Sequence, residues 1–589
     1  MPISLLGIVL FLAPFSLIFI FKNHYLGFLS ILGLSFLYQI SLALLSQLTG
    51  SFSWLTIFLG HSVLIALTLI LLLVNRKRLS YKKILNPLLV LVSLAFLIIA
   101  FEFWSVHYNY TGTISTITGQ QLVINKKMPY PYFSDEWVGT AIVKKTIDTQ
   151  SLISGNPLAP GNDYSHYQNP LLIFFSLLAE LTLLFNLPIS NSYSILLIIF
   201  STLICLNSFI FLRINKVNLL PALIATLSLP FIANSGNLPG LWTLLPFSGG
   251  LLFFIPALSS LSLKRVDLFI LFSFLTILMY PPLIVFVALS ALAYFIINKK
   301  ISWPTILFSA SFLIASLLAT WLIFYFQNLS LSEMINFLRN SIWREYLDPG
   351  IVSYPIWRVV PIASLLAIVL GIKGALRKNL LTLWLPLVGG LVLWSYYSYS
   401  GQVLIISPER VVIIVSLLLV IISGFTLDKL LALINYQRWP EHLLIIACLG
   451  LFTLLSVFYT NFNVWDKFYL TMANGQKMTP NPPATIYLNP SDLNLFSSLD
   501  QQRFIAPPWK GLAIGALTTN YPLQSKPSFF TNNYLDFEHF FLASCEEKIN
   551  LALQYKIDYV YSPFFACQNF ASLGKSSENI YLYKFEPHE

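Results

Sequence analysis

The chain has 589 residues, of which 57% are hydrophobic and 10% are charged, and its mean hydropathy is +0.75. This excludes a soluble globular protein, because one core cannot bury so much apolar surface and many apolar runs approach the ~20 residues that span a bilayer. The formal charge of +10 does not indicate nucleic-acid binding, because the basic residues lie mainly in short loops where they set membrane orientation. We predict a multi-pass protein of the plasma membrane, surrounded by membrane lipids.

The N-terminal part of the chain sets the predicted orientation. The apolar stretch from Ile3 to about Phe21 has no basic segment before it and no clear cleavage pattern after it, so it is predicted to be a retained span. The third connection is strongly basic, with Arg76, Lys77, Arg78, Lys82 and Lys83. Positive loops stay inside, which places the N-terminus and residues 107–169 outside.

Later basic loops extend this orientation along the chain. They place residues 327–360 in a second outer loop and deliver residues 460–589 to the outside. Residues 1–459 are predicted to form a polytopic α-helical membrane domain with about 12 to 14 spans. Between Leu171 and Leu263 four apolar segments occur where the charges require an odd number of crossings, so one is predicted to be re-entrant or merged with its neighbour.

The sequence Tyr280-Pro281-Pro282 interrupts one apolar stretch. Proline has no N–H to donate and disfavours helix at the residue before it, which indicates a hairpin tip or a break between short helices. Such breaks at membrane depth usually border protein or a wet cavity, and an ordinary turn between helices is equally compatible with the sequence.

Residues 460–589 differ from the rest and are predicted to form an extracytoplasmic α/β domain. Ser544 and Glu547 have the spacing of a capping box before a helix that ends near Tyr555. Two runs read as strands, Ile557 to Tyr561 and Ile580 to Phe585.

Two further features of this domain are open to interpretation. Cys545 and Cys567 are the two cysteines whose placement makes pairing plausible, whereas Cys205 and Cys448 lie in apolar runs. The segment Pro507-Pro508-Trp509-Lys510-Gly511 favours a buried turn over a carbohydrate-stacking corner.

The outer loop of residues 107–169 contains the clearest chemical signal. Asp135 and Glu136 follow a segment rich in Tyr and Pro, and an amphipathic stretch follows from Val138 to Thr149. The loop then leads into the next span through Asp163-Tyr164-Ser165-His166-Tyr167-Gln168-Asn169-Pro170-Leu171. The acidic pair could be reactive, or it could solvate the loop or cap the following helix.

This pattern resembles the integral-membrane glycosyltransferases of the type C fold, which use polyprenyl-phosphate-linked sugars. The resemblance extends to Pro408-Glu409-Arg410 at the head of a late span, where related enzymes often carry an arginine, and to the outer C-terminal domain. The chain departs from the commoner pattern in having four spans before the acidic loop. It also lacks the Trp-Trp-Asp-Tyr-Gly sequence of oligosaccharyltransferase catalytic subunits, which argues against transfer of a whole oligosaccharide to asparagine.

The resemblance implies transfer of a sugar from a polyprenyl-phosphate donor to an extracytoplasmic glycan, lipid or protein. Such a reaction needs a carboxylate that accepts the acceptor's proton, and a single base without a covalent intermediate implies inversion. Asp135 is the predicted base, and Glu136 is the second catalytic candidate.

The donor phosphate needs a fixed cation as it leaves. Arg410 is the first candidate, with Arg344 and Arg358 as substitutes. The predicted substrate-binding residues are Asp163, His166 and Tyr167, although a lone interfacial histidine is more often structural.

No metal or other cofactor is assumed, since arginine can neutralise a monophosphate, but Asp135, Glu136 and Asp163 could bind a divalent cation. Two alternative functions remain: a transporter or flippase of lipid-linked glycans, and a non-catalytic cell-envelope assembly protein. A transporter is expected to carry ionisable residues in mid-membrane or an inverted repeat, and neither is evident in the sequence. An assembly protein would not explain the acidic aromatic loop.

Overall fold

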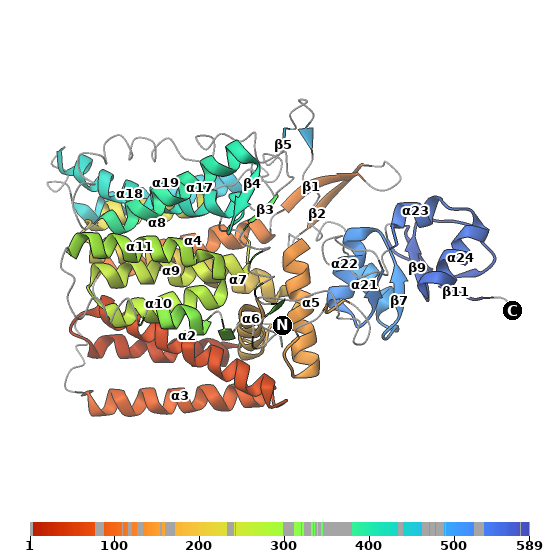
Figure 1. Ribbon diagram of the computed structural model, residues 1–589, viewed down its shortest axis with the longest axis horizontal. Helices are drawn as coiled ribbons and strands as arrows, with labels where there is room; N and C mark the ends of the chain where they lie inside the picture. Colours follow the sequence, from red (N-terminus) through yellow and green to blue (C-terminus); the bar gives the residue numbers. More distant parts are fainter. Residues whose placement is uncertain are drawn as a thin grey trace.

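The computed structural model describes residues 4–76, 87–108, 110–115, 121–126, 134–153, 156–158, 171–232, 241, 243–298, scattered positions between 311 and 345, 380–433, 440–461, 470–471, 477–478, 488, 490–523, 535–577 and 579–587. In this part of the chain a broad layer of apolar helices is joined to a smaller mixed domain at the C-terminus (Figure 1). One helix, α5 (Ser134–Thr149), runs across the ends of the apolar helices and separates the two parts.

The helical layer is built from both halves of the sequence. Before α5 lie α1 (Leu5–Leu12), the 3-10 helix η1 (Ala13–Ile20), α2 (His24–Leu48), α3 (Trp54–Val74) and α4 (Pro87–Tyr108). After it come α6 (Leu172–Leu184), α7 (Ile189–Ile214), α8 (Leu219–Leu227), η4 (Leu229–Phe231), α9 (Pro246–Ser262), α10 (Val266–Met279), η5 (Pro281–Leu283), α11 (Ile284–Asn298), α17 (Leu381–Ser400), α18 (Pro408–Leu433) and α19 (Glu441–Asn461). Of the described helices, α2, α3, α7, α17 and α18 are long and apolar enough to cross a membrane, and several shorter apolar helices accompany them. The protein is therefore a multi-pass membrane protein, as its composition predicts.

Proline explains where two of the predicted spans are interrupted. The stretch from Ile3 to Phe21 is not one continuous helix, because α1 ends at Leu12 and the 3-10 helix η1 begins at Ala13. Pro14, the second residue of η1, has no N–H to donate to a regular α-helical hydrogen bond. At Tyr280 the prediction of a break is confirmed, because α10 ends, Tyr280 is extended (φ −151°, ψ 93°) and α11 resumes after η5.

The four apolar segments predicted between Leu171 and Leu263 form four separate helices, α6 to α9. No two of them are merged. Helix α8 has nine residues and so rises about 14 Å, against the ~30 Å of a hydrocarbon core. It is the candidate for the re-entrant segment.

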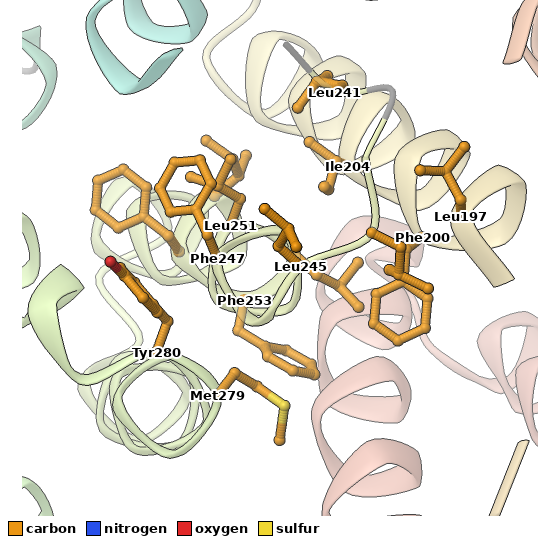
Figure 2. Packing of buried hydrophobic residues seen from close by; sticks show 14 of the residues in the cluster. Leu197, Phe200, Ile204, Leu241, Leu245, Phe247, Leu251, Phe253, Met279 and Tyr280 are labelled. Atoms are coloured by element: carbon orange, nitrogen blue, oxygen red, sulfur yellow. The ribbon is translucent and has the colours of Figure 1, made fainter. Parts of the chain in front are cut away.

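Helix α9 forms the centre of the layer. Its residues from Pro246 to Leu261 are all buried, and it packs against α7 and α10. Figure 2 shows side chains of α7, including Phe200 and Ile204, beside Phe253 and Leu251 of α9. Because lipid is as apolar as these side chains, close packing of this kind is what holds membrane helices together.

Ionisable side chains also lie inside the layer, although none was evident in mid-membrane from the sequence. His61 of α3 and Glu180 of α6 are both fully buried, and His61 Nε2 lies 2.5 Å from Glu180 Oε1. Glu102 of α4 is 5% exposed. Close by, Ser176 donates to Gln47 Oε1 at 2.8 Å, so a polar seam joins α2, α3 and α6. The residues involved are far apart in the sequence, which is why spacing did not reveal them.

We predict that this buried pair is strongly coupled. Replacing His61 with Leu should lower the free energy of unfolding by about 3 kcal/mol, because it leaves the Glu180 carboxyl without its imidazole in an apolar setting. The double change of His61 and Glu180 to Leu should cost less than the sum of the single changes. Equilibrium unfolding in mixed detergent micelles measures the free energies of unfolding of the wild type, the two single variants and the double variant.

A suitable control is Ser62→Ala, because the Ser62 hydroxyl donates to the carbonyl of Phe58 within the same helix, α3. Ser62→Ala should change the free energy of unfolding only slightly. Additive costs for His61 and Glu180 would contradict the predicted coupling.

The C-terminal part is a mixed α/β domain, as predicted. Its elements are α21 (Pro490–Phe496), β7 (Arg503–Ile505), α22 (Pro508–Leu517), β8 (Tyr521–Pro522), α23 (Phe537–Leu542), α24 (Cys545–Tyr555), β9 (Tyr559–Ser562), β10 (Phe570–Lys575) and β11 (Tyr581–Phe585). The strand order is β10-β11-β9-β7-β8, with β7 parallel to both neighbours and β11 antiparallel to both of its own.

Local sequence signals account for much of this domain. The Ser544 hydroxyl accepts a hydrogen bond from the N–H of Glu547 at 3.2 Å, and α24 ends at Tyr555, as predicted. The pairing of Cys545 with Cys567 is also confirmed.

The predicted buried turn at Pro507 to Gly511 is wrong, because Pro508 is the first residue of α22, a position that suits proline. Lys510 is buried there and donates to Asp492 at 2.7 Å. Asp492 also accepts from the hydroxyl of Tyr561 at 2.5 Å.

Three short antiparallel pairs complete the described structure. They are β1 (Tyr110–Ser115) with β2 (Gln121–Lys126), β3 (Trp343–Glu345) with β4 (Gln402–Leu404), and β5 (Leu470–Thr471) with β6 (Lys477–Met478). Strand β4 lies just before α18, so the β3–β4 pair brings the 343–345 segment next to the start of that helix.

Candidate functional site

Helix α5 connects the two parts of the protein. It packs against α6 and α7 of the helical layer and against α22 of the C-terminal domain. The amphipathic helix predicted from Val138 is confirmed, but it begins earlier, at Ser134. Asp135 and Glu136 therefore lie in its first turn, where carboxylates interact favourably with the helix dipole.

A glycine allows α5 to approach the helical layer closely. A Cβ atom at Gly139 would lie 1.8 Å from the hydroxyl oxygen of Tyr193 in α7 and 2.8 Å from a ring carbon of Phe175 in α6. A larger side chain at this position requires the Tyr193 or Phe175 side chain to move.

We predict that Gly139→Ala destabilises the protein by about 1–3 kcal/mol, because the added methyl overpacks this contact. Changing Tyr193 to Phe as well should restore part of the loss by removing the nearest atom. The measurement is the unfolding temperature of the purified protein. Gly450→Ala in α19 is the control, since a Cβ there meets no atom of the described residues within 4 Å. An equal loss of stability in both variants would show that the close contact at Gly139 is not the cause.

The opposite side of α5 contacts the C-terminal domain. The Lys145 ammonium lies 5.8 Å from the ring centroid of Tyr521. Burial raises the pKa of the Tyr521 hydroxyl, and Asp500 adds to this effect while Lys144 opposes it. Tyr521 thus stays a neutral platform for the lysine.

Glu136 is held by the helical layer. Its side chain is 1% exposed, and Oε1 accepts the backbone N–H of Leu244 at 2.8 Å, directly before α9. A buried carboxylate needs such a donor, and the positive end of a helix favours it. Glu136 therefore links α5 to the start of α9, while Asp135 beside it is partly exposed.

Arg410, at the start of α18, lies in the same region. One of its terminal nitrogens donates to the hydroxyl of Tyr280 at 2.5 Å, and its guanidinium carbon lies 5.0 Å from the centroid of that ring. Asp135 and Glu409 both interact electrostatically with the guanidinium. The structure thus brings together Asp135 and Arg410, the two residues that the sequence put forward as base and phosphate ligand.

Of the other candidate residues, the structure describes only Arg344. Arg344 lies in β3 with its backbone paired to Val403, a few residues before Arg410. Asp163, His166, Tyr167 and Arg358 fall outside the residues that the structure describes.

No group of three or more His, Cys, Asp or Glu side chains that could hold a metal ion occurs within the described ranges. Because Asp163 lies outside them, the cation site with Asp135 and Glu136 stays a prediction.

Sequence reasoning missed Tyr280 and the backbone of Leu244 as parts of this region. Tyr280 carried a signal, since it directly precedes Pro281-Pro282, but the sequence indicated only a break there. Leu244 carried none, because a backbone N–H contributes through its position alone.

No protein-family model matches the sequence, and no curated protein matches it significantly. Several solved structures do. The chain is similar in fold to an archaeal oligosaccharyltransferase. AglB from Archaeoglobus fulgidus, in complex with an inhibitory peptide and a dolichol-phosphate, matches with a TM-score of 0.46 and 13% identity over 82% of this chain and 70% of that one.

The apo form of the Archaeoglobus fulgidus oligosaccharyltransferase matches with a TM-score of 0.48 and 12% identity, over 80% of this chain and 69% of that one. Its complex with zinc and sulfate gives a TM-score of 0.43 and 12% identity, over 84% and 73%. These are membrane glycosyltransferases of the type C fold, the class that the acidic-loop motif resembles.

Proposed function

We propose that this protein is a membrane glycosyltransferase that moves a sugar from a polyprenyl-phosphate-linked donor to a hydroxyl of an extracytoplasmic glycan, lipid or protein. The observation that carries the proposal is that Asp135 of α5 lies within electrostatic range of Arg410, whose guanidinium the hydroxyl and ring of Tyr280 hold at the start of α18. A partly exposed carboxylate beside a fixed guanidinium provides both charges that such a transfer needs.

Arg410 is assigned to the donor phosphate. When the bond between the anomeric carbon and the phosphate oxygen breaks, the electron pair stays on the phosphate, and a positioned guanidinium stabilises that charge. Tyr280 engages one terminal nitrogen of Arg410. Arg410 Nε is shielded from solvent and has no hydrogen-bond partner among the described residues.

Asp135 is assigned as the general base. The acceptor oxygen forms a bond to the anomeric carbon, and its proton passes to the Asp135 carboxylate. A single base without a covalent intermediate gives inversion at that carbon. Glu136 is already bonded to Leu244, so we assign it to positioning α5 rather than to proton transfer.

The place of α5 suits an acceptor that arrives from water. The helix lies across the ends of the apolar helices and next to the C-terminal domain (Figure 1). If the basic loops set the orientation as the sequence predicts, this face of the protein is extracytoplasmic.

The experiment uses the full-length protein in lipid nanodiscs. Radiolabelled sugars on polyprenyl monophosphate and diphosphate are offered singly, with crude envelope extract as acceptor and protein-free nanodiscs as control. The proposal expects label to move from one donor into the extract. Folded protein that consumes no donor would overturn it.

One observation favours a second candidate function, transport of a lipid-linked glycan. The buried pair of His61 and Glu180 is the kind of intramembrane ionisable group that transporters carry. Proteoliposomes with the labelled donor in one leaflet separate the two functions. Transport moves the intact donor to the other leaflet, whereas transfer removes its sugar.

A further inference from the structure

Tyr280 occupies a position that the chain fixes unusually firmly. Pro281 disfavours a helical conformation at the residue before it, and Tyr280 is accordingly extended. Its N–H still donates to the carbonyl of Thr276 at 2.9 Å, and its own carbonyl accepts the N–H of Leu283 at 3.1 Å. The backbone is therefore held on both sides of the break between α10 and α11.

The side chain of Tyr280 is fixed as well. It is 4% exposed, and its ring meets that of Phe247 in α9 edge to face, with centroids 5.6 Å apart (Figure 2). At Gly250, one turn along α9, a Cβ atom would lie 3.0 Å from the Tyr280 Cβ. The phenol thus has little freedom to turn away from Arg410.

Arg410 has two kinds of neighbour that compete for its guanidinium. Tyr280 contacts it through its hydroxyl and its ring face. Asp135 and Glu409 attract it electrostatically. A paired, fork-shaped contact with either carboxylate would occupy the donors that a phosphate needs.

We propose that Tyr280 is a positioning residue that holds Arg410 ready for the donor phosphate and keeps the guanidinium from pairing with Asp135. The inference rests on the proposed function and deepens it. Because the hydroxyl accepts from Arg410, its own proton remains free to be donated. It can be donated to an oxygen of the same phosphate.

The test compares Tyr280→Phe, which keeps the ring, with Tyr280→Leu, which removes both contacts. Tyr280→Phe should raise the KM for the lipid-linked donor about tenfold, the effect of losing one hydrogen bond to a charged group. The kcat should change much less, because binding before the reaction is what is lost. Tyr280→Leu should raise the KM further.

Tyr38→Phe is the matched control. The hydroxyl of Tyr38 also makes one hydrogen bond between helices, to the carbonyl of Gly60 at 2.6 Å, but it belongs to α2 and α3. If Tyr280 were merely structural, both Phe variants would lower the unfolding temperature and neither would change the donor KM selectively.

Binding of polyprenyl phosphate without a sugar is measured on the same variants. It distinguishes failure of the inference about Tyr280 from failure of the proposed function. Transfer by the wild type with an unchanged donor KM in Tyr280→Phe would overturn the inference and leave the proposed function standing. Wild type that binds polyprenyl phosphate but transfers no sugar would overturn the function, and weaker binding by Tyr280→Phe would still support the positioning role. Wild type that neither binds nor transfers would overturn both.

Discussion

Asp135→Asn is expected to reduce sugar transfer by a factor of about 10²–10⁴, the usual contribution of a positioned general base. Asparagine preserves the shape of the side chain but cannot accept the acceptor's proton. Loss of one acidic residue from the first turn of α5 costs only about 0.3–1 kcal/mol in stability, so expression and membrane insertion should be unchanged. The measurement is the rate of label transfer from the donor that the wild type uses.

Asp148→Asn is the matched control for this change. Asp148 lies at the other end of α5, is 47% exposed and pairs with Lys144. Its loss should leave the transfer rate nearly unchanged, since exposed ion pairs contribute little. Wild-type turnover by Asp135→Asn would remove Asp135 from the mechanism.

Arg410→Met is expected to lower kcat/KM for the donor by a factor of about 10²–10³, as for other groups that stabilise charge in a transition state. Arg410→Lys should lose less, because lysine keeps the charge but not the planar fork that matches phosphate oxygens. Comparing kcat/KM for the donor in the two variants therefore distinguishes the contribution of the positive charge of Arg410 from that of its planar shape.

Arg265→Gln controls for the loss of a guanidinium. Arg265 lies before α10, is 41% exposed and pairs with Asp267 at 2.5 Å. Arg265→Gln should leave kcat/KM for the donor nearly unchanged. If Arg410→Met and Arg265→Gln behaved alike, Arg410 would have no special role at the donor phosphate.

Much of the local structure could be predicted from the sequence. The cap at Ser544, the break at Tyr280 and the helix after the acidic pair depend on residues within one or two turns, and the structure confirms all three. Signals of this kind act through backbone geometry that neighbouring residues determine.

The contacts that assemble the candidate site could not be predicted in the same way. Tyr280 reaches Arg410 only because α10 ends close to the start of α18, and Glu136 reaches Leu244 only because α5 crosses the start of α9. The same holds for His61 and Glu180, whose helices α3 and α6 meet through packing. The spacing of residues along the chain does not predict which helices pack against each other.

The position of α5 also bears on the order in which the protein is made. The chain emerges from the ribosome N-terminus first, so Asp135 is synthesised well before Arg410, and α22 follows later still. Until α18 is inserted Asp135 lacks Arg410, and until α22 folds the flank of α5 that α22 covers stays open to water. A nascent chain therefore contains Asp135 before Arg410. The pair is completed when α18 is inserted, and the flank of α5 is covered later, when the C-terminal domain docks.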